Sequence, residues 1–280
     1  MSEITITLPD KNKIKVEKGS TVLDVAKKIG AGLAKAALAG KIDGNLADLG
    51  TKIEKDVSIE IITSKSKEAK EILRHSAAHV LAEAVISIFP DAKPTIGPSI
   101  DDGFYYDFYV KKSFTPDDMA KLEKKMEEII KKDSRFERIV MKRKDAIAFY
   151  KKEENKFKQE IIDDHKDEEI SFYKSGAFTD LCRGPHIESA GKIGAIKLTK
   201  ISGAYWRGDE KRESLQRIYG VAFFTKKELD DYLTSGKTAL CVIEREQYRQ
   251  MPQIVALSSI LDQEGNKVLI TAASKASGKK

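Results

Sequence analysis

Two histidines four residues apart constrain the fold of this chain more than any other feature of its sequence. His75 and His79 lie in a helix-forming run that Pro90 ends after Phe89, because proline cannot continue a helix. On an α-helix this spacing places both imidazoles on one face, one turn apart. The apolar residues form a broad stripe on nearly the opposite side: Leu73, Ala77, Val80, Leu81, Ala84 and Ile88. A core histidine would be expected within that stripe, so the pair is predicted to face a ligand.

A second stretch with ligand-type side chains follows far along the chain, at residues 180–186. It contains Asp180, Cys182 and His186, and Gly184-Pro185 within it indicates a loop. Three of the four histidines fall in these two stretches, which are therefore expected to meet in one site. The fourth, His165, lies in an acidic segment that is predicted to be a solvated loop outside the site. The glutamate that follows the first histidine of a metalloprotease helix is missing, which excludes that class.

Length, charge and cysteine content narrow the class of protein. A chain of 280 residues is long enough for two or three domains. No apolar run reaches membrane-spanning length, the N-terminus has no secretory pattern, and the two cysteines make no disulfide framework. A cytoplasmic protein without a membrane partner is expected. The net charge of +6 suggests a polyanionic partner, and the basic stretch from Lys131 to Lys144 is either a phosphate-contacting surface or a solvated charged face.

Residues 1–64 are predicted to form a small β-grasp unit. Apolar and polar residues alternate over 4–8 and 14–16, which indicates two strands around a turn. Ser20 is expected to cap a short helix that Gly30 closes, before a last strand at residues 57–61. The unit has no histidine or cysteine, and no part in catalysis is expected of it.

Residues 65–233 are predicted to form a larger α+β domain. Glycines and a proline around residues 97–108 indicate a hairpin with aromatic core residues, and Thr115 is expected to cap a helix. The run 155–162 is expected to enter a strand, in which Lys158 taken alone would be a surface residue.

Several motifs follow one another in a distinctive order. After the strands of residues 4–63 come RHSAAHVLAEAV, IGPSIDDGFYYDF, TDLCRGPHI, SGAYWRGD and LQRIYGVAF. Over residues 3–233 this series resembles the N-terminal half of bacterial-type threonyl-tRNA synthetases. The resemblance implies a ubiquitin-like β-grasp domain of the TGS type, followed by an α+β editing domain of the threonyl/alanyl-tRNA synthetase second-additional-domain type.

Residues 234–280 are a tail of unknown role. They are not similar to the linker that leads into the class II catalytic core of that family, and no arginine motif for ATP is found, so threonine activation is not expected from this chain. Within the tail, residues 238–243 and 267–270 are expected to pair around Gly265-Asn266, and the end from Ala272 to Lys280 is expected to fray.

The resemblance implies hydrolytic editing, in which serine wrongly attached to the threonine tRNA is removed. The chain is expected to do this either as the editing portion of a threonyl-tRNA synthetase or as a free-standing equivalent. By the same resemblance, His75 and Lys158 are the residues that activate water. The residues that would line the pocket and hold the substrate are His79, Asp180, Cys182 and His186. The expected partner is the acceptor end of tRNA(Thr) carrying serine, with a separate synthetase catalytic subunit as a second candidate. A monomer is expected, since synthetases of this type dimerise mainly through the catalytic core.

Other interpretations use the same residues. A tetrahedral zinc set can be drawn from His75, His79, Cys182 and His186, and the more distantly similar alanyl-tRNA synthetase editing domains are associated with zinc here. Four protein ligands close a metal site, which suits a structural metal, so water activation without a cofactor is favoured. Cys182 paired with His186 as a nucleophile is a further alternative that ester hydrolysis does not require. Two alternative functions stay open: a non-catalytic tRNA-binding or regulatory module, and a zinc-dependent deacylase for another mischarged tRNA, such as an alanine tRNA carrying serine.

Overall fold

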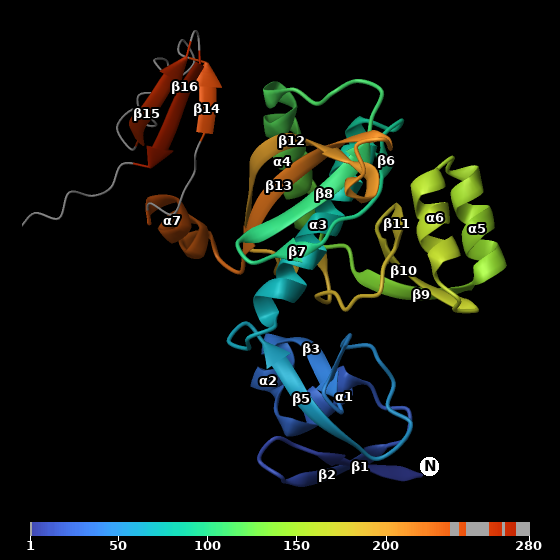
Figure 1. Ribbon diagram of the computed structural model, residues 1–280. Coiled ribbons are helices and arrows are strands. Elements are labelled where there is room, and N and C mark those ends of the chain that lie inside the picture. Colours follow the sequence, from blue (N-terminus) through green and yellow to red (C-terminus); the bar gives the residue numbers. More distant parts are fainter. Residues whose placement is uncertain (1, 236–240, 245–257, 265–266, 273–280) are drawn as a thin grey trace, which may run out of the picture.

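The computed structural model describes residues 2–235, 241–244, 258–264 and 267–272. One long helix, α3 (Ala69–Ile88), starts beside a small N-terminal sheet and runs into a larger body of helices and sheets (Figure 1). The mixture of helices and largely antiparallel sheets confirms the expected α+β class. Within these ranges, no helix is both long enough and apolar enough to cross a membrane.

The N-terminal sheet has five strands in the order β2-β1-β5-β3-β4, with β1 and β5 parallel. The strand bounds are β1 Glu3–Thr7, β2 Lys13–Glu17, β3 Ala37–Ile42, β4 Asn45–Ala47 and β5 Val57–Thr63. Helices α1 (Val22–Ile29) and α2 (Ala31–Ala36) pack on it. The cap of α1 is Thr21 and not Ser20, because the side chains and backbone of Thr21 and Asp24 form a reciprocal capping box. Gly30 closes α1 as predicted.

The small sheet and the larger body share one hydrophobic core. Leu38 and Ala39 of β3 and Ile62 of β5 belong to the same buried cluster as the apolar residues of α3. A continuous core fixes two units against each other far more firmly than a polar linker can. The β-grasp unit is therefore packed against α3 and not merely tethered to it.

The central sheet lies against α3 and has the strand order β12-β13-β8-β6, with β7 paired to β8. Its strands are β6 Lys93–Pro94, β7 Ser99–Ile100, β8 Gly103–Tyr109, β12 Ala195–Tyr205 and β13 Ser214–Phe223. The predicted hairpin is formed by β7 and β8, and alternate residues of β8 enter the core: Phe104, Tyr106 and Phe108. Helix α4 (Pro116–Lys132) packs on α3 and β12 and starts with the predicted cap at Thr115.

A three-stranded sheet, β11-β10-β9, carries two helices on one side (Figure 1). Its elements are β9 Phe136–Lys142, β10 Glu169–Ser175, β11 Phe178–Leu181, α5 Arg143–Lys152 and α6 Lys156–Asp164. The strand predicted over 155–162 is wrong, because these residues form α6. Asn155 caps that helix by accepting a hydrogen bond from the Lys158 N–H (3.2 Å), and the apolar residues at 157, 161 and 162 follow the helical period.

The remaining elements lie between and after these sheets. Two 3₁₀ helices, η1 (Ala190–Lys192) and η2 (Trp206–Gly208), flank β12, and α7 (Lys226–Thr234) packs on β12 and β13. The tail forms a sheet in the order β14-β16-β15, from β14 Cys241–Glu244, β15 Ser258–Glu264 and β16 Lys267–Ala272. Residues 241–243 pair with 268–270 as predicted, but the strand that precedes Gly265-Asn266 and also pairs with β16 is β15, which was not predicted. Residues 238–240, the turn at 265–266 and the end from residue 273 lie outside the described residues.

Candidate active site

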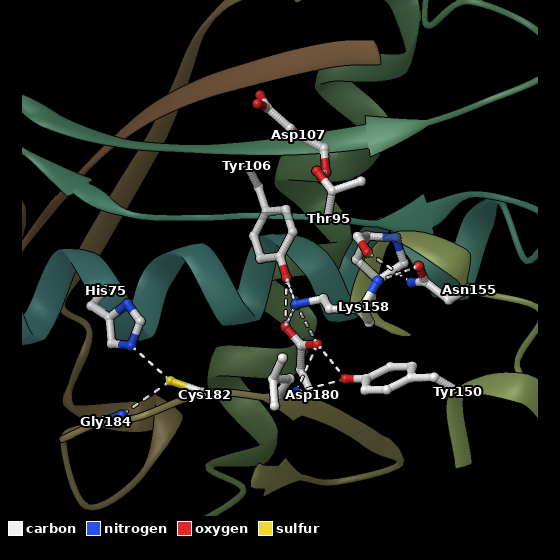
Figure 2. Close-up of polar contacts among 12 residues, drawn as sticks. His75, Thr95, Tyr106, Asp107, Tyr150, Asn155, Lys158, Asp180, Cys182 and Gly184 are labelled. Carbon is white, nitrogen blue, oxygen red and sulfur yellow. Dashed lines mark hydrogen bonds and ion pairs between the residues drawn. The ribbon is translucent and has the colours of Figure 1, made fainter. Parts of the chain in front are cut away.

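The two stretches that carry the predicted site residues meet at the middle of α3. The His75 Nε2 lies 3.0 Å from the Cys182 Sγ (Figure 2). The His186 Nε2 lies 3.3 Å from the same sulfur. With His79, these residues place four potential ligand atoms within 4.8 Å of one another. The two stretches therefore lie together in space, as predicted. The prediction that only the apolar stripe of α3 is buried is wrong, because the helix is buried on nearly all sides and His79 is only 4% exposed.

Ser76 determines how His186 is held. The Ser76 hydroxyl donates to the Ile72 carbonyl (2.8 Å) and accepts from the Ile187 N–H (3.1 Å). Its only proton is therefore used, so the His186 Nδ1, 3.0 Å away, must be the donor in that contact. The His186 Nε2 is left as an acceptor that faces the sulfur of Cys182.

A second cluster lies beside the histidines and is built on an ion pair. The Lys158 Nζ lies 2.7 Å from one carboxylate oxygen of Asp180 and 3.0 Å from the other, and both side chains are almost fully buried. Tyr106 and Tyr150 each donate a hydroxyl hydrogen bond to Asp180 (Figure 2). The Leu181 N–H is a fourth donor. A buried carboxylate needs such complete satisfaction, because an unpaired charge would be strongly destabilising.

Both clusters open onto one cavity of about 430 Å³. His75, His79, Lys158, Asp180 and Cys182 all line it, whereas His186 lies behind Cys182 and is not among the lining residues. The fourth histidine, His165, was excluded from the site by the sequence analysis but lies near it. It lies at the end of α6, lines the same cavity, and its ring nitrogens are 3.3 Å from the Arg183 Nη2.

Burial keeps the histidines and the thiol of the site neutral. Desolvation lowers the pKa of His75 to about 4 and that of His79 to about 3, and it holds the pKa of His186 well below its usual value. Burial also raises the pKa of the Cys182 thiol to about 12. At neutral pH the imidazoles can accept protons, and Cys182 is a protonated thiol, which disfavours its use as a nucleophile. For Asp180, burial is outweighed chiefly by the Lys158 ammonium, which lowers the pKa.

The chemistry of the histidine–cysteine group fits a zinc ion. Three imidazoles and one thiol are typical zinc ligands, and tetrahedral coordination requires ligand atoms about 3.4 Å apart. The contacts of 3.0 and 3.3 Å at Cys182 are shorter than this spacing and the 4.8 Å limit over all four atoms is longer, so the four side chains would have to shift slightly to hold the ion. The Ser76 contact to His186 Nδ1 is the kind of outer interaction that orients a metal-binding imidazole.

Several residues of the site were missed by the sequence analysis. Tyr106 was expected to be an aromatic core residue, and Tyr150, Tyr173 and Ser76 were not singled out. Tyr106 could have been found from the sequence, because its position in the strand points it into the core and a buried tyrosine hydroxyl needs a polar partner. Asp48 of the β-grasp unit, which contacts the loop of His186, could not be found from local sequence.

Comparison with known families finds two domain families in the chain. Residues 4–63 match the TGS domain, and residues 170–219 match the family described as the threonyl and alanyl tRNA synthetase second additional domain. The chain therefore contains both domains, and the second match includes Asp180, Cys182 and His186. The β-grasp and editing-type fold that the resemblance implied is confirmed.

Similar curated proteins are threonine–tRNA ligases. That of Citrifermentans bemidjiense is 49% identical over 270 residues, which is 96% of this chain but 42% of the relative. That of Hahella chejuensis is 54% identical over 229 residues, or 81% of this chain and 36% of the relative. The chain thus spans less than half the length of these relatives. The first match must include most of residues 234–280, which corrects the expectation that the tail departs from the family.

Proposed function

Since the chain carries the TGS and second additional domains and corresponds to the N-terminal part of threonine–tRNA ligases, we propose that it hydrolyses serine from tRNA(Thr) mischarged with serine. A synthesis site that must admit threonine cannot reject serine strongly, because one missing methyl group is worth only about 1–3 kcal/mol. A separate hydrolytic site supplies the missing discrimination. The observation that carries the proposal is the convergence of His75, Lys158 and Cys182 on one cavity.

The cavity suits the end of a charged tRNA. Its volume of about 430 Å³ falls within the range of sites that bind small ligands, roughly 300–1,000 Å³. Arg183 and His165 lie at its wall, beside Asp167 and Glu169. In this proposal the aminoacyl ester enters past Arg183, whose guanidinium suits a phosphate of the acceptor strand.

His75 and Lys158 have complementary parts in the hydrolysis: His75 activates the water, and Lys158 stabilises the charge that forms. A water molecule attacks the ester carbonyl, the carbonyl–ribose oxygen bond breaks, and serine and free tRNA are released. His75 accepts a proton of the water through its neutral imidazole and passes it to the ribose oxygen as the ester bond breaks. Lys158 projects beside the same cavity and stabilises the negative charge that develops on the carbonyl oxygen.

The other predicted residues have distinct parts in this proposal. His79 and Cys182 line the cavity and contact the seryl group and the terminal ribose. Asp180 already accepts from Tyr106, Tyr150, Lys158 and the Leu181 N–H, so its part is to hold Lys158 in place. His186 supports Cys182 from behind.

Zinc provides a second candidate function, a metal-dependent deacylase. The four residues that would hold the ion are His75, His79, Cys182 and His186. Held by all four, zinc would fix the loop of Cys182 against α3, and it would supply Lewis-acid chemistry for hydrolysis if one of the four ligands left a position open. Metal analysis of the purified chain separates the two candidates, since stoichiometric zinc that is required for hydrolysis would favour the second.

The decisive experiment is hydrolysis of Ser-tRNA(Thr) and Thr-tRNA(Thr) by the full chain. We expect rapid release of serine only, abolished by His75→Ala and by Lys158→Ala. Lys156→Ala is the matched control, because Lys156 lies on the same helix with an exposed side chain paired to Glu213. If tRNA binds and neither ester is hydrolysed, the non-catalytic tRNA-binding alternative replaces this proposal.

A further inference from the structure

One carboxylate of the β-grasp unit reaches the loop of the candidate active site. Asp48 lies just after β4, and its Oδ1 accepts a hydrogen bond from the His186 N–H (3.0 Å). Its Oδ2 accepts another from the Tyr173 hydroxyl (2.5 Å). The two partners lie in different elements of the larger body, since Tyr173 belongs to β10 and His186 to the loop after β11. Asp48 therefore joins both to the small sheet.

The two partners of Asp48 also pack on each other around the loop. The rings of Tyr173 and His186 have centroids 4.5 Å apart in an edge-to-face arrangement. The Tyr173 hydroxyl lies so close to Gly184 that a Cβ there would come within 2.0 Å of it. Gly184 in turn donates its N–H to the Cys182 Sγ (3.2 Å). The position of the Tyr173 hydroxyl therefore affects the conformation of the whole turn from Cys182 to His186.

Asp48 is held firmly by its own unit. Its carbonyl accepts from the Thr51 N–H (3.0 Å), and the next residue, Leu49, is buried in the core beneath α1 and accepts from the Leu23 N–H (2.9 Å). The small sheet is also continuous with the core around α3. A carboxylate fixed in this way holds the loop in a defined position relative to the β-grasp unit.

We infer that Asp48 is a positioning residue of the candidate active site and that the β-grasp unit is an integral part of that site. Asp48 orients the backbone of His186 and the hydroxyl of Tyr173, and through them the loop that carries Cys182. The effect on turnover rests on the proposed hydrolysis, whereas the effect on the loop does not. This contrasts with the sequence, in which nothing of residues 1–64 pointed to a site.

The catalytic test compares three variants of the full chain, and one control variant, on Ser-tRNA(Thr). Asp48→Ala removes both hydrogen bonds, and we expect kcat to fall about 10–100-fold, as for outer residues that orient a site, with little change in KM. Asp48→Asn keeps an acceptor for the His186 N–H and offers its amide N–H to the Tyr173 oxygen, so it is expected to restore most of kcat. Tyr173→Phe is expected to be intermediate.

The matched control is Asp43→Ala. Asp43 is a carboxylate of the same sheet that accepts from the Ser58 N–H and hydroxyl, away from the site. It removes two hydrogen bonds from the β-grasp unit and adds backbone strain, because the φ angle of Asp43 is 46° and alanine is disfavoured there. It does not touch the loop, so its kcat should still equal that of the unchanged chain. An equal loss of kcat in Asp43→Ala and Asp48→Ala would overturn the inference, since a general weakening of the unit would then explain both.

A second measurement does not depend on activity. The chain has four histidines, so protein labelled with ¹⁵N-histidine has four backbone amide signals. We expect the His186 amide signal to move in Asp48→Ala, to return in Asp48→Asn, and to stay in place in Asp43→Ala, while the His165 signal is unchanged throughout. A His186 signal that does not move in Asp48→Ala would refute the positioning role. If the unchanged chain hydrolyses nothing, the proposed function fails, and these spectra still decide whether Asp48 positions the loop.

Discussion

Replacement of Lys158 by methionine tests whether the buried ion pair holds the site together. Methionine has a similar length and volume, so the change removes the charge and leaves no large cavity. At a separation of 2.7 Å, the attraction in the pair is about 6 kcal/mol for an effective dielectric constant of about 20. The variant loses this attraction, but part of the loss is offset because folding no longer requires the desolvation of an ammonium group. Breaking a buried pair costs about 3–5 kcal/mol, and we expect the lower end, about 3 kcal/mol, because Tyr106, Tyr150 and the Leu181 N–H still donate to Asp180.

The pH dependence of this loss identifies its cause. In the unchanged chain the pKa of Asp180 is lowered below 3.8, so its contribution to stability is present above that value and is lost as the pH falls through the lowered pKa. Without the ammonium, burial raises the pKa of Asp180 in the folded variant. Its carboxyl then takes up a proton as the pH falls, and the penalty for a buried charge disappears. The stability difference between the two proteins should therefore shrink from pH 7 toward pH 4.5.

The assay is urea unfolding followed by tryptophan fluorescence. The single tryptophan, Trp206, is buried and packs on Phe157, the neighbour of Lys158. We expect the midpoint of Lys158→Met to fall by about 1 M urea or more at pH 7. The control Lys156→Met breaks an exposed pair with Glu213 and should change the free energy of unfolding by less than about 1 kcal/mol. A loss below that value in Lys158→Met, or one that does not vary with pH, would refute the reasoning.

Three further predictions concern the surroundings of the site. Ser76→Ala leaves the Nδ1 of His186 without its acceptor and should lower the hydrolytic rate in a steady-state assay about 10–100-fold. A rate equal to that of the unchanged chain would show that the tautomer of His186 is unimportant. The double variant Arg138→Glu, Lys142→Glu reverses two exposed charges on β9. Its affinity for tRNA should be lower and should depend less steeply on salt concentration, as measured by binding at several salt concentrations. Unchanged binding would favour the interpretation of this stretch as a solvated charged face. Because burial raises the pKa of the Cys182 thiol to about 12, its alkylation should be slower than that of a peptide thiol and should still increase above pH 9, followed by mass spectrometry of the peptide that contains it; a plateau near pH 8 would contradict this.

Patterns with a short range were predicted well. The capping box at Thr115, the glycine that ends α1 and the aromatic alternation of β8 depend on neighbours within a few residues. The same is true of the histidine pair, whose common face follows from the helical period alone. The run 155–162 was predicted wrongly because a cap at Asn155 was not recognised and its apolar residues were assigned the wrong period.

The amino-acid sequence by itself determined which residue types could carry chemistry here: a histidine pair on a helix, and an aspartate, a cysteine and a third histidine in a loop. Only the tertiary structure decided how they act on one another. Lys158 became buried because α6 turns it toward Asp180, and Asp48 came to hold His186 because the small sheet packs against α3. These contacts join residues far apart in the chain, and their formation depends on the packing of whole elements, which local propensity and spacing do not encode.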